Sequence, residues 1–198
     1  MIRNNSQNGD IERRHYTCEG IEVRNDEDQP PRLIGYAAMF GEMSEDLGGF
    51  RERIAPGAFS KAIGGDVRAL FNHDSNLILG RTKSKTLTIV EDQRGLRIEI
   101  TPPDTQVARD LMESVSRGDV DQMSFGFRTI KENWEEVDGE LVRTLVEVRL
   151  FDVSPVVFPA YPQTEIALRS MSAWKSENDL GGRPGYRDKH RSLDLLEL

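Results

Sequence analysis

Three residues of types that could carry nucleophilic catalysis lie at positions where an extended chain could hold them. His73 ends a short apolar run and begins a polar one, Ser124 interrupts an apolar stretch flanked by aromatics, and Asp152 lies inside an otherwise apolar segment. Such catalysis needs a hydroxyl or thiol, a base within hydrogen-bond reach, and a group that orients the base. Since few residues here can be that base, a site of this kind would form around His73.

Each of these residues also has an ordinary structural explanation. His73 could be a surface or core histidine satisfied by neighbouring Asp74, and Ser124 could be a strand serine bonded to the backbone. A carboxylate in an apolar strand is costly unless paired, so Asp152 could orient a histidine, cap a backbone amide or pair with an arginine. Glu147, on the opposite strand face, is the second choice for the carboxylate. From the residues alone these alternatives stay open.

Other chemistries find little support in the sequence. A lone Cys18 and three histidines far apart in sequence predict neither an internal disulfide nor a zinc cluster. The isolated glycine pairs lack the strand, loop and helix order of a phosphate-binding site. A GxSxG motif, typical of α/β-hydrolases, does not occur. We therefore expect no cofactor and no metal.

The composition favours one soluble domain with short tails. The chain has 198 residues, 37% of them hydrophobic, and 26 Lys+Arg against 34 Asp+Glu give a net charge of -8. The charges are interspersed and form no basic face, so we expect no nucleic-acid partner. The sequence has neither an apolar run of spanning length nor the apolar core of a secretion signal in its first ten residues, so we expect no membrane partner and a cytosolic location.

The elements that would position the candidate residues are mostly strands. Period-two alternation predicts a hairpin over residues 86–90 and 96–100, and a second one over 123–134 and 141–157 around the Asp138-Gly139 turn. Apolar positions repeating at helical spacing between Pro103 and Gly118 predict the clearest helix. Weaker patterns predict a bulged strand at 14–24, a strand at 33–40 and a short helical turn at 58–63.

These elements predict a mainly β fold with some α: a bent or closed β-barrel flanked by a few helices. We expect a flexible N-terminal tail over residues 1–12, one folded domain over 13–168, and a flexible C-terminal tail over 169–198, where the composition turns polar.

Several segments, in order and spacing over residues 33–166, resemble the prohead proteases of tailed phages, the HK97-type family, whose fold is similar to that of herpesvirus assemblins. The stretches that carry the resemblance are LIGYAAMF at 33–40, GGFRE at 48–52, IAPGAF at 54–59, FNHD at 71–74, LGRT at 79–82, TL at 86–87, GL at 95–96, RGD at 117–119, MSFGF at 123–127, DVSPV at 152–156 and PAYP at 159–162. One departure is Lys85, which stands where the family commonly has glycine and should alter a turn.

The resemblance implies a serine peptidase in which Ser124 is the nucleophile and His73 the general base. It implies that Asp152, 28 residues after Ser124, is the carboxylate that orients the histidine. Backbone amides are the default donors to the oxyanion, with Arg81 or Arg128 as side-chain candidates.

The resemblance also implies an endopeptidase that works inside the assembling procapsid in the host cytoplasm. Its substrate would be the scaffold or the scaffolding segment of the major capsid protein, and it would also cut itself, with the tail from Ser170 as a candidate segment. A homo-oligomer is possible by analogy with assemblins. Two alternative hypotheses remain. The chain could be an inactive scaffold or assembly factor with the protease fold, or a hydrolase of another ester or amide.

Overall fold

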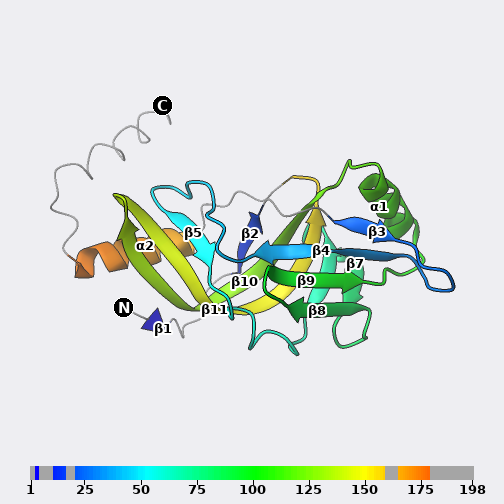
Figure 1. Cartoon of the computed structure of the whole chain (residues 1–198), viewed down its shortest axis with the longest axis horizontal. Helices are drawn as coiled ribbons and strands as arrows, with labels where there is room; N and C mark the ends of the chain where they lie inside the picture. The colour runs from blue at the N-terminus through cyan, green and yellow to red at the C-terminus, as the bar shows by residue number, and fades with distance from the viewer. Residues whose placement is uncertain (1–2, 5–10, 17–20, 159–164, 179–198) are drawn as a thin grey trace.

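The computed structural model describes residues 3–4, 11–16, 21–158 and 165–178, which form two β-sheets and two helices (Figure 1). The larger sheet contains β1 (Arg3–Asn4), β2 (Glu12–Tyr16), β5 (Arg51–Ile54), β6 (Arg68–Phe71), β7 (Asp74–Arg81), β10 (Gln122–Val137) and β11 (Glu140–Val156). The smaller sheet contains β3 (Glu22–Arg24), β4 (Arg32–Met39), β8 (Leu87–Glu91) and β9 (Gly95–Ile100). The helices are α1 (Gln106–Ser116) and α2 (Glu165–Glu177).

The long β10–β11 hairpin is the centre of the larger sheet. The path of that sheet is β1-β10-β11-β6-β7, with β2 also paired to β10 and β5 to β11. The hairpin turns at Asp138 and Gly139, which both have positive φ (52° and 81°), as a two-residue turn of the favoured type requires. This confirms the hairpin predicted around that dipeptide.

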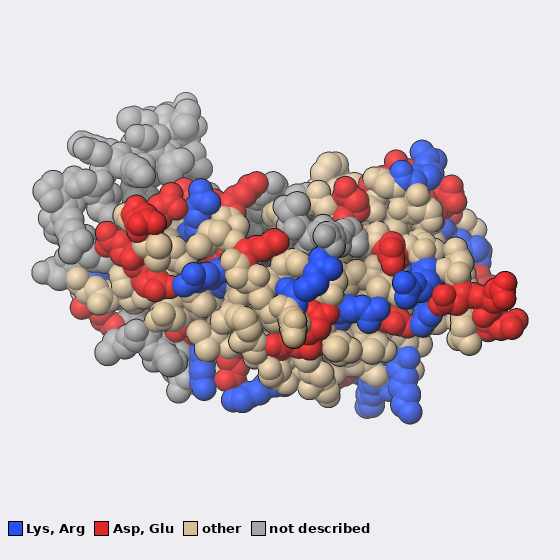
Figure 2. Space-filling model, in the orientation of Figure 1, with Lys and Arg blue, Asp and Glu red and all other residues tan. Residues whose placement is uncertain are grey.

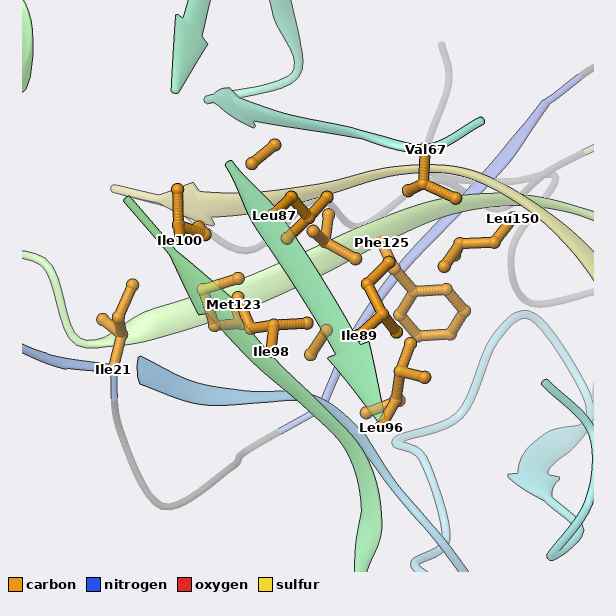
Figure 3. Packing of buried hydrophobic residues seen from close by; sticks show 14 of the residues in the cluster. Ile21, Val67, Leu87, Ile89, Leu96, Ile98, Ile100, Met123, Phe125 and Leu150 are labelled. Carbon is orange, nitrogen blue, oxygen red and sulfur yellow. The ribbon is translucent and has the colours of Figure 1, made fainter. Parts of the chain in front are cut away.

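The two sheets face each other across one hydrophobic core. The smaller sheet has the order β3-β4-β9-β8 and contains the predicted hairpin as β8 and β9. Its inward side chains alternate with outward ones and meet the apolar face of β10 and β11. Figure 3 shows this contact, with Leu87, Ile89, Leu96, Ile98 and Ile100 from the smaller sheet against Met123, Phe125 and Leu150 from the larger.

The helices agree only in part with the sequence. α1 begins after the N-cap Thr105, whose hydroxyl accepts from the Ala108 amide, and Gly118 follows it with φ 79°, as predicted. α2 was not predicted. Residues 169–177, expected to begin a flexible tail, lie in α2, where Met171 and Trp174 are buried against Phe50, Trp134 and Leu141. None of the described helices is long and apolar enough to cross a membrane.

Two further expectations need correction, and a third is confirmed. The described strands form two open sheets, so the predicted closed barrel is not found; alternation reports which face is buried, but it does not report whether a sheet closes. The stretch at 14–24 is divided between β2 in one sheet and β3 in the other, and not one bulged strand. Residues 58–63 lie in a run of turns that includes one helical turn, in which Ile63 N donates to Phe59 O at 3.0 Å, as predicted.

The structure describes part of the two expected tails and the position of Lys85, where the sequence departs from the family pattern. Residues 3–4 and 12, assigned to the N-terminal tail, pair with β10. Residues 179–198 lie outside the described residues, as does Cys18. Lys85 has a φ of 59°, in the left-handed region that glycine favours, so the lysine bears backbone strain in this turn. The expected alteration of the turn relative to the family stays a prediction.

A buried ionic cluster ties β2 to the hairpin. Arg143, with a side chain 1% exposed, bonds to Glu12 (2.8 Å), Glu52 (2.9 Å) and Glu132 (2.7 Å). Arg14 bonds to Glu52 at 2.9 Å and to Glu12 at 3.0 Å. Because every carboxylate in the cluster has a guanidinium partner, the charges can lie away from water.

Replacing Arg143 by methionine should lower the free energy of unfolding by about 3–5 kcal/mol, because it leaves buried carboxylates without their shared cation. Urea unfolding followed by circular dichroism measures the loss. Arg149, an exposed arginine of the same strand whose guanidinium lies over the Phe151 ring, is the matched control. Arg149→Met should cost at most about 1 kcal/mol. Equal losses at the two positions would contradict a structural role for the cluster.

The cluster should also make the protein sensitive to acid. Burial raises the pKa of Glu12, but the charge and hydrogen bonds of Arg143, aided by Arg14, outweigh it and lower the pKa from 4.5 to about 2. Since the folded pKa lies below the unfolded one, this stabilisation is complete above pH 4.5 and is lost as the pH falls through about 2. The melting temperature should therefore drop over that window. The drop should be smaller in Glu12→Gln; an undiminished drop would refute the assignment.

Candidate active site

His73 lies at the tip of the β6–β7 hairpin, in a two-residue turn. Phe71 pairs with Asp74, and the turn residues Asn72 and His73 both have positive φ (52° and 57°). Asparagine and histidine tolerate this region better than most side chains. The tip is fixed to the end of β11, because the Asn72 amide donates to the Pro155 carbonyl at 3.0 Å and the Asn72 side-chain oxygen accepts from a neighbouring amide. The backbone therefore holds the imidazole over the larger sheet.

Ser124 and Asp152 lie on the adjacent strands β10 and β11. Ser124 pairs with Ser154, and Gly126 pairs with Asp152. Successive side chains point to opposite faces of a strand. Because Phe125 and the other neighbouring apolar side chains fill the core, these polar residues share the opposite face. The register thus places a hydroxyl and a carboxylate together beneath the β6–β7 turn.

The structure brings the three predicted site residues into one hydrogen-bonded chain. His73 Nε2 lies 2.7 Å from Ser124 Oγ, and His73 Nδ1 lies 2.5 Å from Asp152 Oδ1. When Nδ1–H donates to Asp152, the other ring nitrogen has a free lone pair that can accept the serine proton. The side chains of His73 and Asp152 are 7% and 10% exposed. The arrangement has the parts of a nucleophile, a base and a group that orients the base.

Ser154 is a fourth member that the sequence analysis missed. Its hydroxyl is buried, donates to Asp152 Oδ1 at 2.8 Å and lies 3.3 Å from His73 Nδ1. The available signal was its position two residues after Asp152 on a strand, which puts both side chains on the same face. Ser154 helps to satisfy a carboxylate that is largely removed from water.

Gly126 leaves room for the carboxylate. A Cβ built on Gly126 would lie 2.1 Å from Asp152 Oδ2, a distance that no side chain can accept without displacing Asp152. A glycine in a strand permits a close approach of another group. The group that approaches Gly126 is the Asp152 side chain.

The Ser124 hydroxyl faces two acceptors. Besides His73 Nε2, the main-chain carbonyl of Arg14 on β2 lies 2.9 Å from Ser124 Oγ and is the second acceptor. A hydroxyl has one proton, so it can donate to only one of these acceptors at a time. Ser124 is also 0% exposed. The Ser124 hydroxyl is therefore covered by the protein's own chain.

Two of the three other candidates, Glu147 and Arg81, are held in ion pairs, and Arg128 lies on the face of β10 that carries Ser124. Glu147 bonds to Lys61 Nζ at 3.0 Å, and that hydrogen bond, opposed by a smaller effect of burial, lowers the pKa of Glu147. Arg81 is held by both carboxylate oxygens of Asp66. Arg128 lies over the Phe151 ring at 5.6 Å. Arg128 follows Gly126 on the same face of β10 as Ser124, and its buried Nε has no hydrogen-bond partner among the described residues.

The described residues also contain no group of three or more His, Cys, Asp or Glu side chains placed to hold a metal ion.

Comparison with known proteins agrees with the resemblance seen in the sequence. A family model described as Caudovirus prohead serine protease matches residues 19–177. The chain belongs to this family. This family member is 31% identical over 140 residues to the prohead protease of Enterobacteria phage HK97. The aligned region covers 67% of this chain and 57% of the HK97 protein. The match thus spans little more than half the length of that relative.

Among solved structures, the fold is similar to that of the bacteriophage T4 capsid assembly protease, gp21. The TM-score is 0.49 and the sequence identity 8%, with 74% of this chain and 96% of that chain covered. The likeness to herpesvirus assemblins stays a prediction, as do the catalytic roles of the individual residues.

Ser154→Ala should lower kcat about tenfold and leave KM nearly unchanged, because Asp152 loses a hydrogen bond that helps to hold the imidazole. Steady-state kinetics on a cleaved peptide measures the split. Ser154→Thr keeps the hydroxyl and should restore most of kcat, whereas a purely structural role would change stability without this pattern. Ser84→Ala, at an exposed serine outside the site, is the control. Wild-type kcat in Ser154→Ala would remove Ser154 from the site.

Proposed function

We propose that this chain is a serine endopeptidase of prohead maturation and that His73, Ser124 and Asp152 are its catalytic triad. The observation that carries the proposal is the continuous pair of hydrogen bonds from Ser124 Oγ through both ring nitrogens of His73 to Asp152. Membership of a serine protease family supports the same chemistry.

Each triad residue has a distinct task. Ser124 Oγ bonds to the carbonyl carbon of the scissile peptide while His73 Nε2 takes the hydroxyl proton. His73 then gives this proton to the leaving amine as the C–N bond breaks. Water, activated by His73, hydrolyses the resulting ester. Asp152 stabilises the imidazolium that forms in each half of the reaction and keeps Nδ1 protonated.

The proposed substrate is the scaffold or the scaffolding segment of the major capsid protein, cut inside the assembling procapsid, and the chain itself. Family membership supports this choice. Figure 2 shows acidic and basic side chains interspersed over one face of the described residues, without an extended basic patch, which suits a protein substrate better than nucleic acid. Homo-oligomer formation is part of the proposal and would concentrate the enzyme at its substrate.

Co-expression with the capsid protein of the same phage tests the function. Wild type should shorten the capsid or scaffold chain, and intact-mass spectrometry should locate the cut. Ser124→Ala and His73→Ala should each abolish it, since removing a triad member costs several orders of magnitude in rate.

Ser60→Ala, at an exposed serine, is the matched control and should cut at the wild-type rate. Cleavage that survives both triad substitutions would disprove the assignment. Capsid assembly that depends on the chain without any cleavage would instead indicate an inactive assembly factor.

A further inference from the structure

The strand β2 pairs with β10 directly beside Ser124. β2 runs antiparallel along β10, with His15 opposite Ser124, Arg14 opposite Phe125 and Arg13 opposite Gly126. Ser124 has no exposed surface in this arrangement. A substrate must contact Ser124 to react with it, so part of the chain must first move aside, and β2 places the Arg14 carbonyl 2.9 Å from Ser124 Oγ.

β2 presents a peptide carbonyl to the nucleophile. Ser124 Oγ donates to the Arg14 carbonyl at 2.9 Å, and the chain on both sides of this carbonyl is extended and paired to β10. Adding an extended strand to a sheet edge is a common mode of peptide recognition, in which main-chain bonds give affinity and side-chain pockets give specificity. β2 therefore has the form of a bound peptide whose Arg14-His15 bond lies at the site.

The side chain of Arg14 fills a buried acidic pocket. Arg14 Nε donates to Glu52 Oε1 at 2.9 Å, and Arg14 Nη2 reaches Glu52 Oε2 at 3.3 Å. Glu52 is 0% exposed, and the guanidinium also lies 5.7 Å from the Phe127 ring centroid. Two bonds to one carboxylate match the planar fork of an arginine, so the pocket is suited to a basic side chain.

A second side chain of β2, that of Glu12, is bound by a cation and a hydroxyl. Glu12, two residues before Arg14, accepts from Thr129 Oγ1 at 2.7 Å and from Arg143 Nη1 at 2.8 Å. Both contacts come from the hairpin strands and not from β2. We call the surroundings of β2 that include Glu52, Thr129 and Arg143 the groove. The groove therefore offers a cationic place for an acidic side chain and an anionic place for a basic one.

The groove lies within the part of the chain that matches the family, and β2 does not. The match covers residues 19–177, which includes Glu52, Thr129 and Arg143 as well as the triad. Without β2, the groove retains the charges of Glu52, Glu132 and Arg143, which sum to one negative charge. That excess suits an incoming cation.

We propose that β2 occupies the substrate groove of this protease and that Glu52 selects a basic residue at the position of Arg14. The substrate is an extended peptide with this basic residue at the carbonyl that Ser124 attacks and an acidic residue two positions before it. The inference rests on the proposed function, because it requires Ser124 to be the nucleophile. It adds a substrate class, a residue that selects it, and the chain segment that the substrate displaces.

Paired peptide phosphonates test the pocket on the full chain. Two diphenyl phosphonate esters carry the side chains of Ile11, Glu12 and Arg13 followed by an arginine or a leucine analogue at the phosphorus. Ser124 Oγ bonds to phosphorus, one phenoxide leaves, and His73 passes it the serine proton. Intact-mass spectrometry should show the arginine probe reacting at least about tenfold faster. In Glu52→Gln this ratio should fall to about twofold.

A small fluorophosphonate without a peptide separates the two failures. If it labels wild type and Glu52→Gln but not Ser124→Ala, the site is folded and reactive. Equal rates for the two peptide probes would then overturn the inference and leave the proposed function intact. If it labels neither wild type nor Arg14→Leu, the proposed function fails, and the inference fails with it.

Substitutions in β2 test the displacement. Arg14→Leu removes the anchor in the Glu52 pocket and should raise the labelling rate with the arginine probe about tenfold. Arg13→Leu, one position earlier and exposed, is the matched control and should stay within about twofold of wild type. Thermal melting confirms that both variants are folded. An unchanged or lower rate in folded Arg14→Leu would show that β2 is a permanent strand and would overturn the proposal.

Discussion

The register between β10 and β11 is the constraint on which the site depends. A slip by one residue would turn Ser124 into the core and bring Phe125 to the polar face. The packing of Phe125 against Phe59 and Phe127 opposes such a slip. A register shift between Gly126 and Phe127 leaves the pairing of Ser124 undisturbed. Apolar burial on one face thus fixes polar geometry on the other.

The buried carboxylate makes its neighbours interdependent. Asp152 is largely removed from water, so it needs donors, and it obtains them from His73 and Ser154. The histidine can serve as a donor only because the turn at Asn72 and His73 accepts a left-handed backbone that costs about 1–3 kcal/mol per residue. The hydrogen bonds from Asn72 to the end of β11 oppose relaxation of that turn. The same strand, β11, is therefore bonded to the strained hairpin tip and carries the desolvated carboxylate of Asp152.

The sequence predicts the parts of this structure that depend on local pattern. The helix between Thr105 and Gly118 and both hairpins follow from caps, period and turn residues. Three features depend on long-range packing, which alternation does not report. They are whether the sheets close into a barrel, the division of residues 14–24 between two sheets, and the helix around Trp174. Ser154 could have been found from its spacing to Asp152. The ionic cluster could not, because its members come from separated segments whose charges look like solvated surface in the sequence.

In the proposed exchange of β2 for substrate, the ionic cluster would hold the strand firmly and still allow its replacement. A buried ion pair adds little net stability, since attraction is largely offset by desolvation, but removing one partner leaves an uncompensated charge that is costly. A peptide with matching charges would therefore replace β2 at little net cost. An apolar peptide would leave Glu52 and Glu132 sharing the single cation of Arg143 and would be rejected. Selection by the groove then comes more from the penalty on wrong occupants than from tight binding of the right one, which suits a protease that must release its products.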